Sequence, residues 1–124
     1  MKTPRKILVV DDNDDIAEAL VLLLKGSGYD ADRAFSAEEC MYKVEEEQPD
    51  LILLDIFLSG GDGREVCKKL RAQPETESLP IIIISAHPNM REPAIAAGAD
   101  DFISKPFVVD DLLKKIENFL PARV

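Results

Sequence analysis

Short apolar runs alternate with longer amphipathic segments along the whole chain. The apolar runs predict five β-strands, at residues 6–10, 30–34, 51–55, 80–84 and 100–104. The first, third and fourth runs are continuously aliphatic, which is typical of strands whose two faces are both covered by helices. Strict alternation of strands and helices also requires right-handed crossover connections. The pattern therefore predicts an α/β fold, a three-layer sandwich with one parallel sheet between two layers of helices.

Four further segments have the apolar spacing of helices that bury one face: residues 14–25, 37–48, 64–72 and 108–120. In the first segment, the predicted buried face consists of Ile16, Ala17, Leu20, Leu23 and Leu24. Ser36 and Glu39 have the spacing of a capping box and mark the start of the second segment. Pro121 directly follows the last segment and marks its end.

The remaining helix, between the fourth and fifth strands, is predicted to be short or mobile. Proline is tolerated only in the first turn of a helix, and Pro93 stands in the middle of this stretch. The helix is therefore expected to start near Glu92 and to stop by Gly98. Five strands and five helices fill the chain without a linker or an internal repeat, so residues 1–124 are expected to form one domain.

Composition and charge narrow the classes of function. The 124 residues include 15 basic and 24 acidic side chains, which give a formal net charge of −9. This charge repels nucleic-acid backbones and anionic membranes, so we expect neither direct nucleic-acid binding nor membrane association. No apolar stretch approaches the length of a membrane span and no charged leader precedes one, which favours a cytoplasmic protein. Cys40 and Cys67 lack the spacing of metal ligands or of a redox pair, and both are expected to be reduced.

Acidic residues stand at the ends of two predicted strands. Asp11 and Asp12 follow the first strand, and Asp55 closes the third, just before a glycine-rich loop. If these strands are parallel neighbours, the three carboxylates meet at the carboxyl edge of the sheet, where open α/β folds bind their ligands. Like charges held that close are costly, and a hard divalent cation such as Mg²⁺ neutralises them.

Two further polar side chains stand at the ends of predicted strands. Ser85 follows the fourth strand, and Lys105 follows the fifth. Three carboxylates, a hydroxyl and an ammonium are the groups that phosphoryl transfer onto a carboxylate requires. The cation neutralises the phosphoryl oxygens, while the lysine and the hydroxyl donate to those that remain. Each residue alone is weakly diagnostic, because an aspartate at a strand end is more often a helix cap. The hypothesis depends on their joint placement at one edge.

Four motifs together resemble the receiver domain of two-component response regulators. They are Val10-Asp11-Asp12-Asn13, Leu54-Asp55-Ile56-Phe57-Leu58-Ser59-Gly60-Gly61-Asp62-Gly63, Ile84-Ser85-Ala86 and Lys105-Pro106-Phe107. The resemblance covers essentially the whole chain, with the motifs in order and at the expected intervals. It implies a flavodoxin-like sheet with strand order 2-1-3-4-5. It also implies a signalling module that catalyses only its own phosphorylation and dephosphorylation, and not an enzyme acting on external substrates.

The resemblance also implies how phosphorylation takes place. Asp55 is implied to accept the phosphoryl group, which comes from a histidine kinase or a histidine phosphotransfer protein. Asp12, Asp55 and the main-chain carbonyl of Phe57 are implied to ligate Mg²⁺ directly, whereas Asp11 acts mainly through a water molecule.

Further residues are implied to bind the phosphoryl group and to transmit its presence. Lys105 pairs with the phosphoryl group, and Ser85 moves to form a hydrogen bond with it. Phe102 matches the aromatic switch of the family, which turns inward when the serine moves. The resulting conformational change is expected to control a downstream protein or output domain. The bond between Lys105 and Pro106 is expected to be cis.

The chain departs from the family pattern in three places. Leu58-Ser59 replaces the usual Met-Pro, a change that the neighbouring glycines make tolerable. The stretch from Ser85 to the switch aromatic is about two residues shorter than in typical members, which puts the usual output surface in question. Phe57 and His87 occupy the positions that flank the acyl phosphate. Because the ring of Phe57 should obstruct in-line water, we predict a long-lived phosphoryl group.

Two alternatives remain open at this point. Asp12-Asn13-Asp14 loosely resembles the Asp-x-Asp motif of small Mg²⁺-dependent phosphohydrolases of the haloacid-dehalogenase type, with Asp12 as the nucleophile. A cap domain is missing, and Asp55 and Lys105 fit a receiver better. The other alternative is a receiver-like module that binds partners without phosphorylation, and the intact acidic set argues against it. Labelling with acetyl phosphate or beryllofluoride separates the receiver hypothesis from the phosphohydrolase hypothesis, because it should modify Asp55 in a receiver and Asp12 in a phosphohydrolase.

Overall fold

Five parallel strands form the main sheet of the computed structural model, which describes residues 4–120. They are β1 (Lys6–Val10), β2 (Asp30–Ala34), β3 (Leu51–Asp55), β6 (Ile81–Ser85) and β7 (Asp101–Ser104). Their order in the sheet is β2-β1-β3-β6-β7, and every neighbouring pair is parallel. Because β6 and β7 are the fourth and fifth strands of this sheet, the predicted order 2-1-3-4-5 is confirmed.

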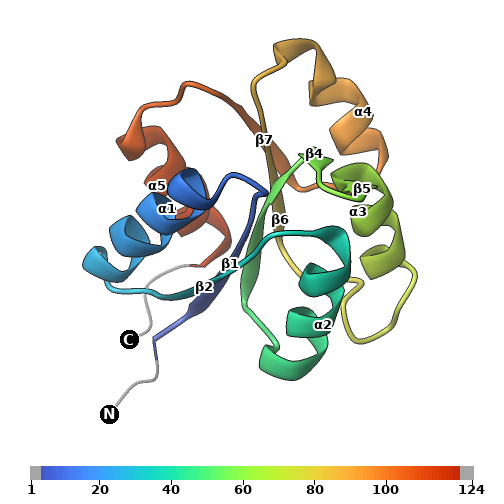
Figure 1. Cartoon of the computed structure of the whole chain (residues 1–124), viewed down its shortest axis with the longest axis horizontal. Helices are drawn as coiled ribbons and strands as arrows, with labels where there is room; N and C mark the ends of the chain where they lie inside the picture. Colours follow the sequence, from blue (N-terminus) through green and yellow to red (C-terminus); the bar gives the residue numbers. More distant parts are fainter. Residues whose placement is uncertain (1–3, 121–124) are drawn as a thin grey trace.

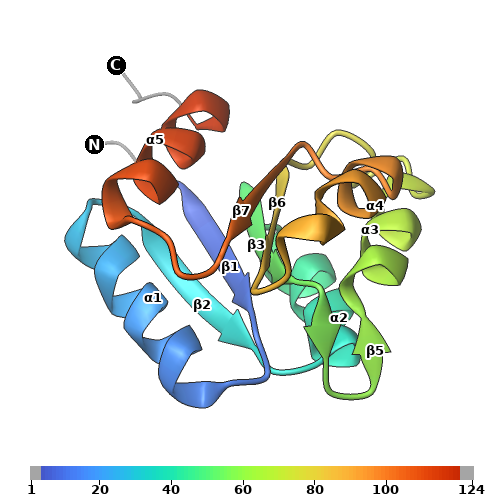
Figure 2. The same cartoon turned by 90° about the horizontal axis from the view of Figure 1, so that it is seen from above.

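Within the described residues, five α-helices and one 3₁₀-helix accompany these strands, and all but the last helix connect one strand to the next. They are α1 (Asp14–Gly26), α2 (Ala37–Glu47), α3 (Gly63–Arg71), η1 (Pro88–Met90), α4 (Arg91–Ala96) and α5 (Val109–Phe119). α1 and α5 cover one face of the sheet, and α2, α3 and α4 cover the other (Figure 1 and Figure 2). The predicted three-layer sandwich is therefore confirmed. Pro121, predicted to mark the end of the last helix, lies outside the described residues.

The side chains of the strands alternate between two hydrophobic cores, one on each face of the sheet. The core under α2, α3 and α4 takes Leu8, Val10, Ile52, Leu54, Ile81 and Ile83. The core under α1 and α5 takes Ile7, Val9, Leu51, Leu53, Ile82 and Ile84. Because both faces are covered, β1, β3 and β6 need apolar residues at nearly every position. Each such burial contributes roughly 1.5–3 kcal/mol relative to an exposed side chain.

Three helices begin at side chains that cap them. The side-chain oxygen of Asn13 accepts from the backbone N–H of Ile16 at 3.2 Å, at the start of α1. The hydroxyl of Ser36 accepts from the N–H of Glu39 at 3.1 Å, which confirms the predicted start of α2. Asp62 caps α3 through the N–H of Arg64 at 2.8 Å. Each cap satisfies an N–H group that the helix itself leaves unpaired.

The buried stripe of α1 is narrower than the sequence predicted. Ala17, Leu20 and Leu24 are buried, whereas Leu23 is half-buried and Ile16 is 37% exposed. The prediction that Ile16 faces the core was therefore wrong. The three buried residues define the centre of the stripe, and Ile16 lies at its margin in the first turn, at the carboxyl edge of the sheet.

The fourth helix is short, as Pro93 predicted. α4 contains six residues, and Pro93 is the third of them, within the first turn. η1 precedes it and has Pro88 at its first position. Both prolines thus stand where a helix does not use the missing N–H. Gly98 follows the helix with a φ of +113°, a left-handed conformation that glycine adopts readily.

The glycine-rich loop after β3 forms a small hairpin that the sequence pattern did not predict. β4 (Phe57–Leu58) pairs antiparallel with β5 (Gly61–Asp62), and Gly60 in the turn has a φ of +73°. Ser59 also forms an isolated bridge with Ser36, directly before α2. The loop that follows Asp55 is therefore tied to the start of a neighbouring helix.

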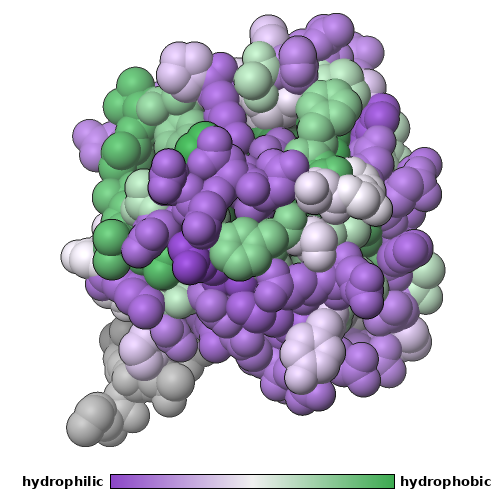
Figure 3. All heavy atoms as spheres, in the orientation of Figure 1, coloured by the Kyte–Doolittle hydropathy of each residue, from purple (hydrophilic) through white to green (hydrophobic). Residues whose placement is uncertain are grey.

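The face shown in Figure 3 is mostly hydrophilic, in keeping with the net charge of −9. Hydrophobic side chains gather along the side of this view where α1 and α5 lie. Leu22 of α1 and Val108 before α5 are among the large apolar residues that are exposed. From residue 4 to residue 120, no helix combines the length and the apolar character needed to cross a membrane. Cys40 and Cys67 are buried and free, and burial raises the pKa of the Cys40 thiol to about 12.

Candidate functional site

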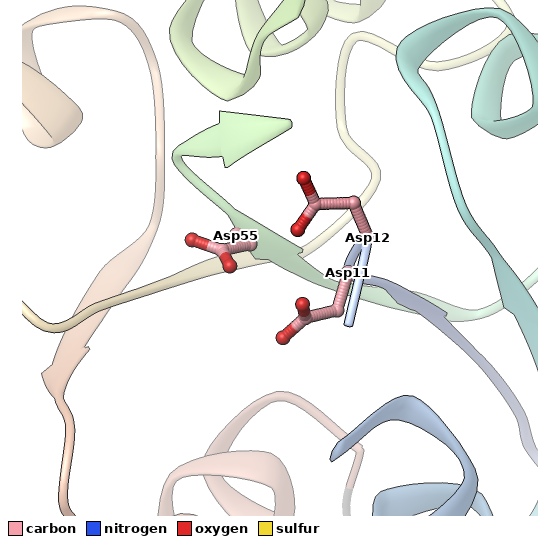
Figure 4. Close-up of side chains that lie close together, drawn as sticks. All are labelled: Asp11, Asp12 and Asp55. Carbon is pink, nitrogen blue, oxygen red and sulfur yellow. The ribbon is translucent and has the colours of Figure 1, made fainter. Parts of the chain in front are cut away.

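Asp11, Asp12 and Asp55 meet at the carboxyl edge of the sheet. β1 and β3 are parallel neighbours, and Val10 pairs with Leu54, so the residues that follow these two lie side by side. Figure 4 shows the three carboxyl groups gathered in one space beyond the strand ends. One oxygen from each acid lies within 4.8 Å of the others. The structure thus brings together the three acids that the strand-end pattern singled out.

The three acids differ in burial and in how firmly they are held. Asp11 is 4% exposed, and its carboxylate accepts from the backbone N–H of Asn13 at 2.9 Å. Asp55 is half-buried, and its carboxylate lies 3.4 Å from the backbone nitrogen of Phe57. Asp12 is exposed and opens the cluster to solvent. A cation that keeps part of its water shell can therefore approach from the side of Asp12.

The Lys105 ammonium lies between two of these acids. Its Nζ is 3.1 Å from Asp11 Oδ2 and 3.2 Å from Asp55 Oδ2. Lys105 directly follows β7, and its backbone N–H donates to the carbonyl of Ser85 at 2.8 Å. The peptide bond between Lys105 and Pro106 is cis, as the resemblance implies. The lysine thereby partly neutralises two carboxylates that would otherwise repel each other.

Burial and the neighbouring opposite charges act in opposite directions on the pKa values of Asp55 and Lys105. Burial is the strongest influence on Asp55 and raises its pKa, Lys105 lowers it, and Asp11 raises it again, which leaves the pKa above its ordinary value. For Lys105, burial lowers the pKa, but its bonds to Asp11 and Asp55 outweigh that effect and raise the pKa. Lys105 therefore stays charged at neutral pH, while the ionised form of Asp55 is less favourable than in water.

Ser85 lies at the same edge, on the strand next to β3. It is fully buried at the end of β6, where Ile84 pairs with Asp55. Its hydroxyl accepts from the backbone N–H of His87 at 3.1 Å. A hydroxyl also carries one hydrogen that it can donate, so Ser85 can keep this bond while it donates to another group.

Two aromatic rings stand together at this end of the molecule. Phe57 is 49% exposed in β4, and its ring lies 5.3 Å from the exposed ring of His87, at an interplanar angle of 89°. This edge-to-face arrangement is a favourable one for aromatic pairs. The family resemblance implied that both residues flank the site, but their contact with each other follows from the folding of two separate loops.

Phe102 and Arg91 form a contact that sequence reasoning missed. Phe102 is 2% exposed in the core under α4, and the guanidinium carbon of Arg91 lies 5.7 Å from the centre of its ring. Eleven positions separate the two residues in the chain. No periodic pattern links them, because only the packing of α4 on β7 brings them together.

The donor set of the acidic cluster fits a hard divalent cation. All the side-chain donors of the cluster are carboxylate oxygens, the ligands that Mg²⁺ prefers, whereas zinc sites favour nitrogen and sulfur. The carboxylates of Asp11, Asp12 and Asp55 lie close enough together to hold such an ion, and the resemblance to receiver domains implies the main-chain carbonyl of Phe57 as a further ligand.

Comparisons with known proteins identify the family. The family model for the response regulator receiver domain matches residues 7–117. The phosphate regulon transcriptional regulatory protein PhoB of Rhizobium meliloti (strain 1021) is 37% identical over 117 residues, which cover 93% of this chain and 52% of that protein. The chain thus spans about half the length of this relative. It belongs to the response regulator receiver domain family, and is therefore a signalling module.

Solved structures share the whole fold. A chain from Chloroflexus aurantiacus J-10-fl described as a response regulator has a TM-score of 0.91 and 36% identity, and the match covers 97% of this chain and all of that one. The chemotaxis response regulator CheY4 of Vibrio cholerae has a TM-score of 0.87 and 28% identity, with 94% and 99% of the two chains covered. These matches do not favour the phosphohydrolase hypothesis.

Proposed function

We propose that this chain acts as one receiver module that accepts a phosphoryl group on Asp55 in a Mg²⁺-dependent reaction. The donor would be a histidine kinase or a histidine phosphotransfer protein, and the setting the cytoplasm. The main support is the position of the Lys105 ammonium, 3.1 Å from Asp11 and 3.2 Å from Asp55. An ammonium group in this position can pair with an incoming phosphoryl group without rearrangement of the sheet. Asp12 has no such lysine contact among the described ion pairs, which favours Asp55 as the acceptor.

The proposed reaction requires a nucleophile, charge neutralisation and alignment. A carboxylate oxygen of Asp55 attacks the phosphorus of a phosphohistidine. A new O–P bond forms as the P–N bond breaks, and the imidazole nitrogen keeps the electron pair of the broken bond. Mg²⁺, when bound, neutralises charge on the phosphoryl oxygens. Lys105 exchanges its bond with Asp55 for one with a phosphoryl oxygen, and the Ser85 hydroxyl donates to another.

The proposed outcome is a change between two conformations that differ by only a few kcal/mol. Ser85 would move toward the phosphoryl group, and the inward position of Phe102, which is 2% exposed in this structure, would become more favourable. Supporting this, Ser85 and Ile83 are two positions apart on β6, so their side chains lie on the same face of the sheet. Ile83 pairs with Phe102 of the neighbouring strand β7. Ser85 and Phe102 therefore both face the layer that contains α4. A downstream protein or output domain would read the change.

A phosphotransfer profile against candidate histidine kinases tests this proposal. We expect radiolabelled phosphoryl to appear on the wild-type chain when Mg²⁺ is present and to disappear when Mg²⁺ is chelated. Asp55→Asn should take up no label, whereas the exposed Glu75→Gln, away from the site, should be labelled like the wild type. Label on Asp12 in the Asp55→Asn variant would overturn the proposal in favour of a phosphohydrolase. No labelling by any kinase or by acetyl phosphate would favour an interaction module that works without phosphorylation.

A further inference from the structure

We infer that Arg91 is a positioning residue that couples Ser85 to Phe102 by clamping the phenyl ring beneath α4. This inference rests on the proposed function, because it assigns the residue through which phosphorylation at Asp55 reaches the switch aromatic.

The side chain of Arg91 makes two contacts with Phe102. Its guanidinium carbon lies 5.7 Å from the centre of the ring, within the distance at which a cation is attracted to an aromatic face. Its Nη2 also lies 3.5 Å from the carbonyl oxygen of Phe102, at the limit for a hydrogen bond. One side chain thus holds both the ring and the backbone of β7.

The packing of α4 makes this clamp possible. Ala94 and Ala97 are buried in the same core as Phe102, and their small side chains let the helix lie close to β7. Figure 2 shows α4 beside α3 on one side of the sheet. Because Arg91 is the first residue of α4, its side chain is placed by the start of this short helix.

Hydrogen bonds within the short segment 85–91 connect Ser85 to Arg91 through the backbone of η1. The Ser85 hydroxyl accepts from the N–H of His87 at 3.1 Å, and the carbonyl of His87 accepts from the N–H of Met90 at 3.1 Å. The N–H of Arg91 then donates to the carbonyl of Pro88. If Ser85 moves toward a phosphoryl group on Asp55, η1 and the start of α4, which carries Arg91, move with it.

The apolar side chain of Phe102 determines which conformation Arg91 favours. Phe102 has no polar atom, so its ring leaves the core only against the hydrophobic effect. Arg91 adds an attraction that exists only while the ring is inward. It therefore favours the inward conformation, which the phosphorylated domain is proposed to adopt. Because Arg91 is exposed, the attraction is modest, and its loss should change a binding constant by about two- to fivefold.

Titration calorimetry with Mg²⁺ and beryllofluoride, a phosphoryl mimic, tests the inference. We expect Arg91→Gln to weaken beryllofluoride binding about two- to fivefold, and Arg91→Lys, which keeps the cation, to retain most of the affinity. Phe102→Leu removes the ring, so Arg91→Gln should have no further effect when combined with it. A purely structural role would instead lower the melting temperature of Arg91→Gln and leave its affinity unchanged.

The possible outcomes separate this inference from the proposed function. Equal affinity of Arg91→Gln and the wild type would overturn the role of Arg91 alone. The role would also be overturned if Arg91→Gln weakened beryllofluoride binding equally in the wild type and in Phe102→Leu, because Arg91 would then not act through the ring. No beryllofluoride binding by the wild type would overturn phosphoryl acceptance itself, and the role of Arg91 with it.

Discussion

Asp55 is subject to burial, to the cation of Lys105 and to the anion of Asp11, and the net result is a raised pKa. A carboxyl group whose pKa is higher in the folded than in the unfolded chain opposes folding once it is ionised. Below about pH 4, where the group is protonated in both states, this opposition disappears. The residue proposed to receive the phosphoryl group therefore reduces the stability of the fold at neutral pH.

Replacement of Asp55 by Asn should accordingly stabilise the protein at neutral pH without Mg²⁺. We expect a rise in the melting temperature on the order of a few °C at pH 7, which shrinks toward zero as the pH falls below about 4. Thermal scans across this pH range check the prediction, with the exposed Glu75→Gln as a control for the loss of a negative charge. A lower melting temperature for Asp55→Asn at pH 7 would contradict the picture of crowded acids.

Phe57 is the residue predicted to shield the phosphoryl group from water, and its ring contacts that of His87. We expect Phe57→Asn to accelerate phosphoryl loss on the order of tenfold, equivalent to about 1.4 kcal/mol of activation free energy. Phe57→Leu keeps apolar bulk and should change the rate much less. The decay of radiolabelled protein measures both rates, and equal decay in Phe57→Asn and the wild type would count against steric shielding.

At the scale of elements, the β4–β5 hairpin connects the acceptor loop to α2. A Cβ at Gly61 would lie only 2.8 Å from the Cβ of Ala37, the first residue of α2. A Cβ at Gly63 would overlap the carbonyl oxygen of Asp55. The second and third helices thus fix the loop whose Phe57 carbonyl is proposed to ligate the metal.

Gly61→Ala should displace this hairpin and weaken Mg²⁺ binding severalfold, because a clash between two Cβ atoms cannot be relieved by rotation of a side chain. Ala37→Gly removes the second Cβ, so the double variant should recover much of the affinity. Gly26→Ala, where a new Cβ meets nothing within 4 Å, should bind Mg²⁺ like the wild type. Calorimetric titration with Mg²⁺ compares the four proteins. A double variant as weak as Gly61→Ala would show that this contact does not position the loop.

At the scale of the whole molecule, the acidic cluster links metal binding to folding. An ion that binds only the folded protein stabilises it, by about 1.4 kcal/mol at ten times its dissociation constant. The net charge of −9 also makes the fold sensitive to salt in general, because screening reduces its self-repulsion. The stabilisation by bound Mg²⁺ must therefore be separated from the stabilisation by ionic strength alone.

We expect Mg²⁺ to raise the melting temperature by a few °C more than NaCl of equal ionic strength does. Asp12→Asn should lose most of this difference, since it removes a proposed ligand from the exposed side of the cluster. Differential scanning calorimetry provides the comparison. An equal rise with NaCl and with Mg²⁺ would mean that the cluster has no specific site for the ion.

The sequence by itself determined the five strands of the main sheet, the five α-helices and their layers. Strands covered on both faces must be apolar throughout, and helices covered on one face must be apolar on one stripe, so each leaves a local pattern. It also indicated the acidic cluster, because Asp11 and Asp55 close strands that a parallel sheet places side by side. These inferences require only residues close together in the chain and the regular geometry of a sheet.

Only the tertiary structure decided how the parts touch. The exposure of Ile16, the ring contact of Phe57 with His87 and the position of Arg91 over Phe102 each depend on loops and helix ends. Such segments repeat no pattern, and the contacts join residues that are distant in the chain. Their geometry is set by the packing of whole elements, which is why it became visible only in the folded molecule.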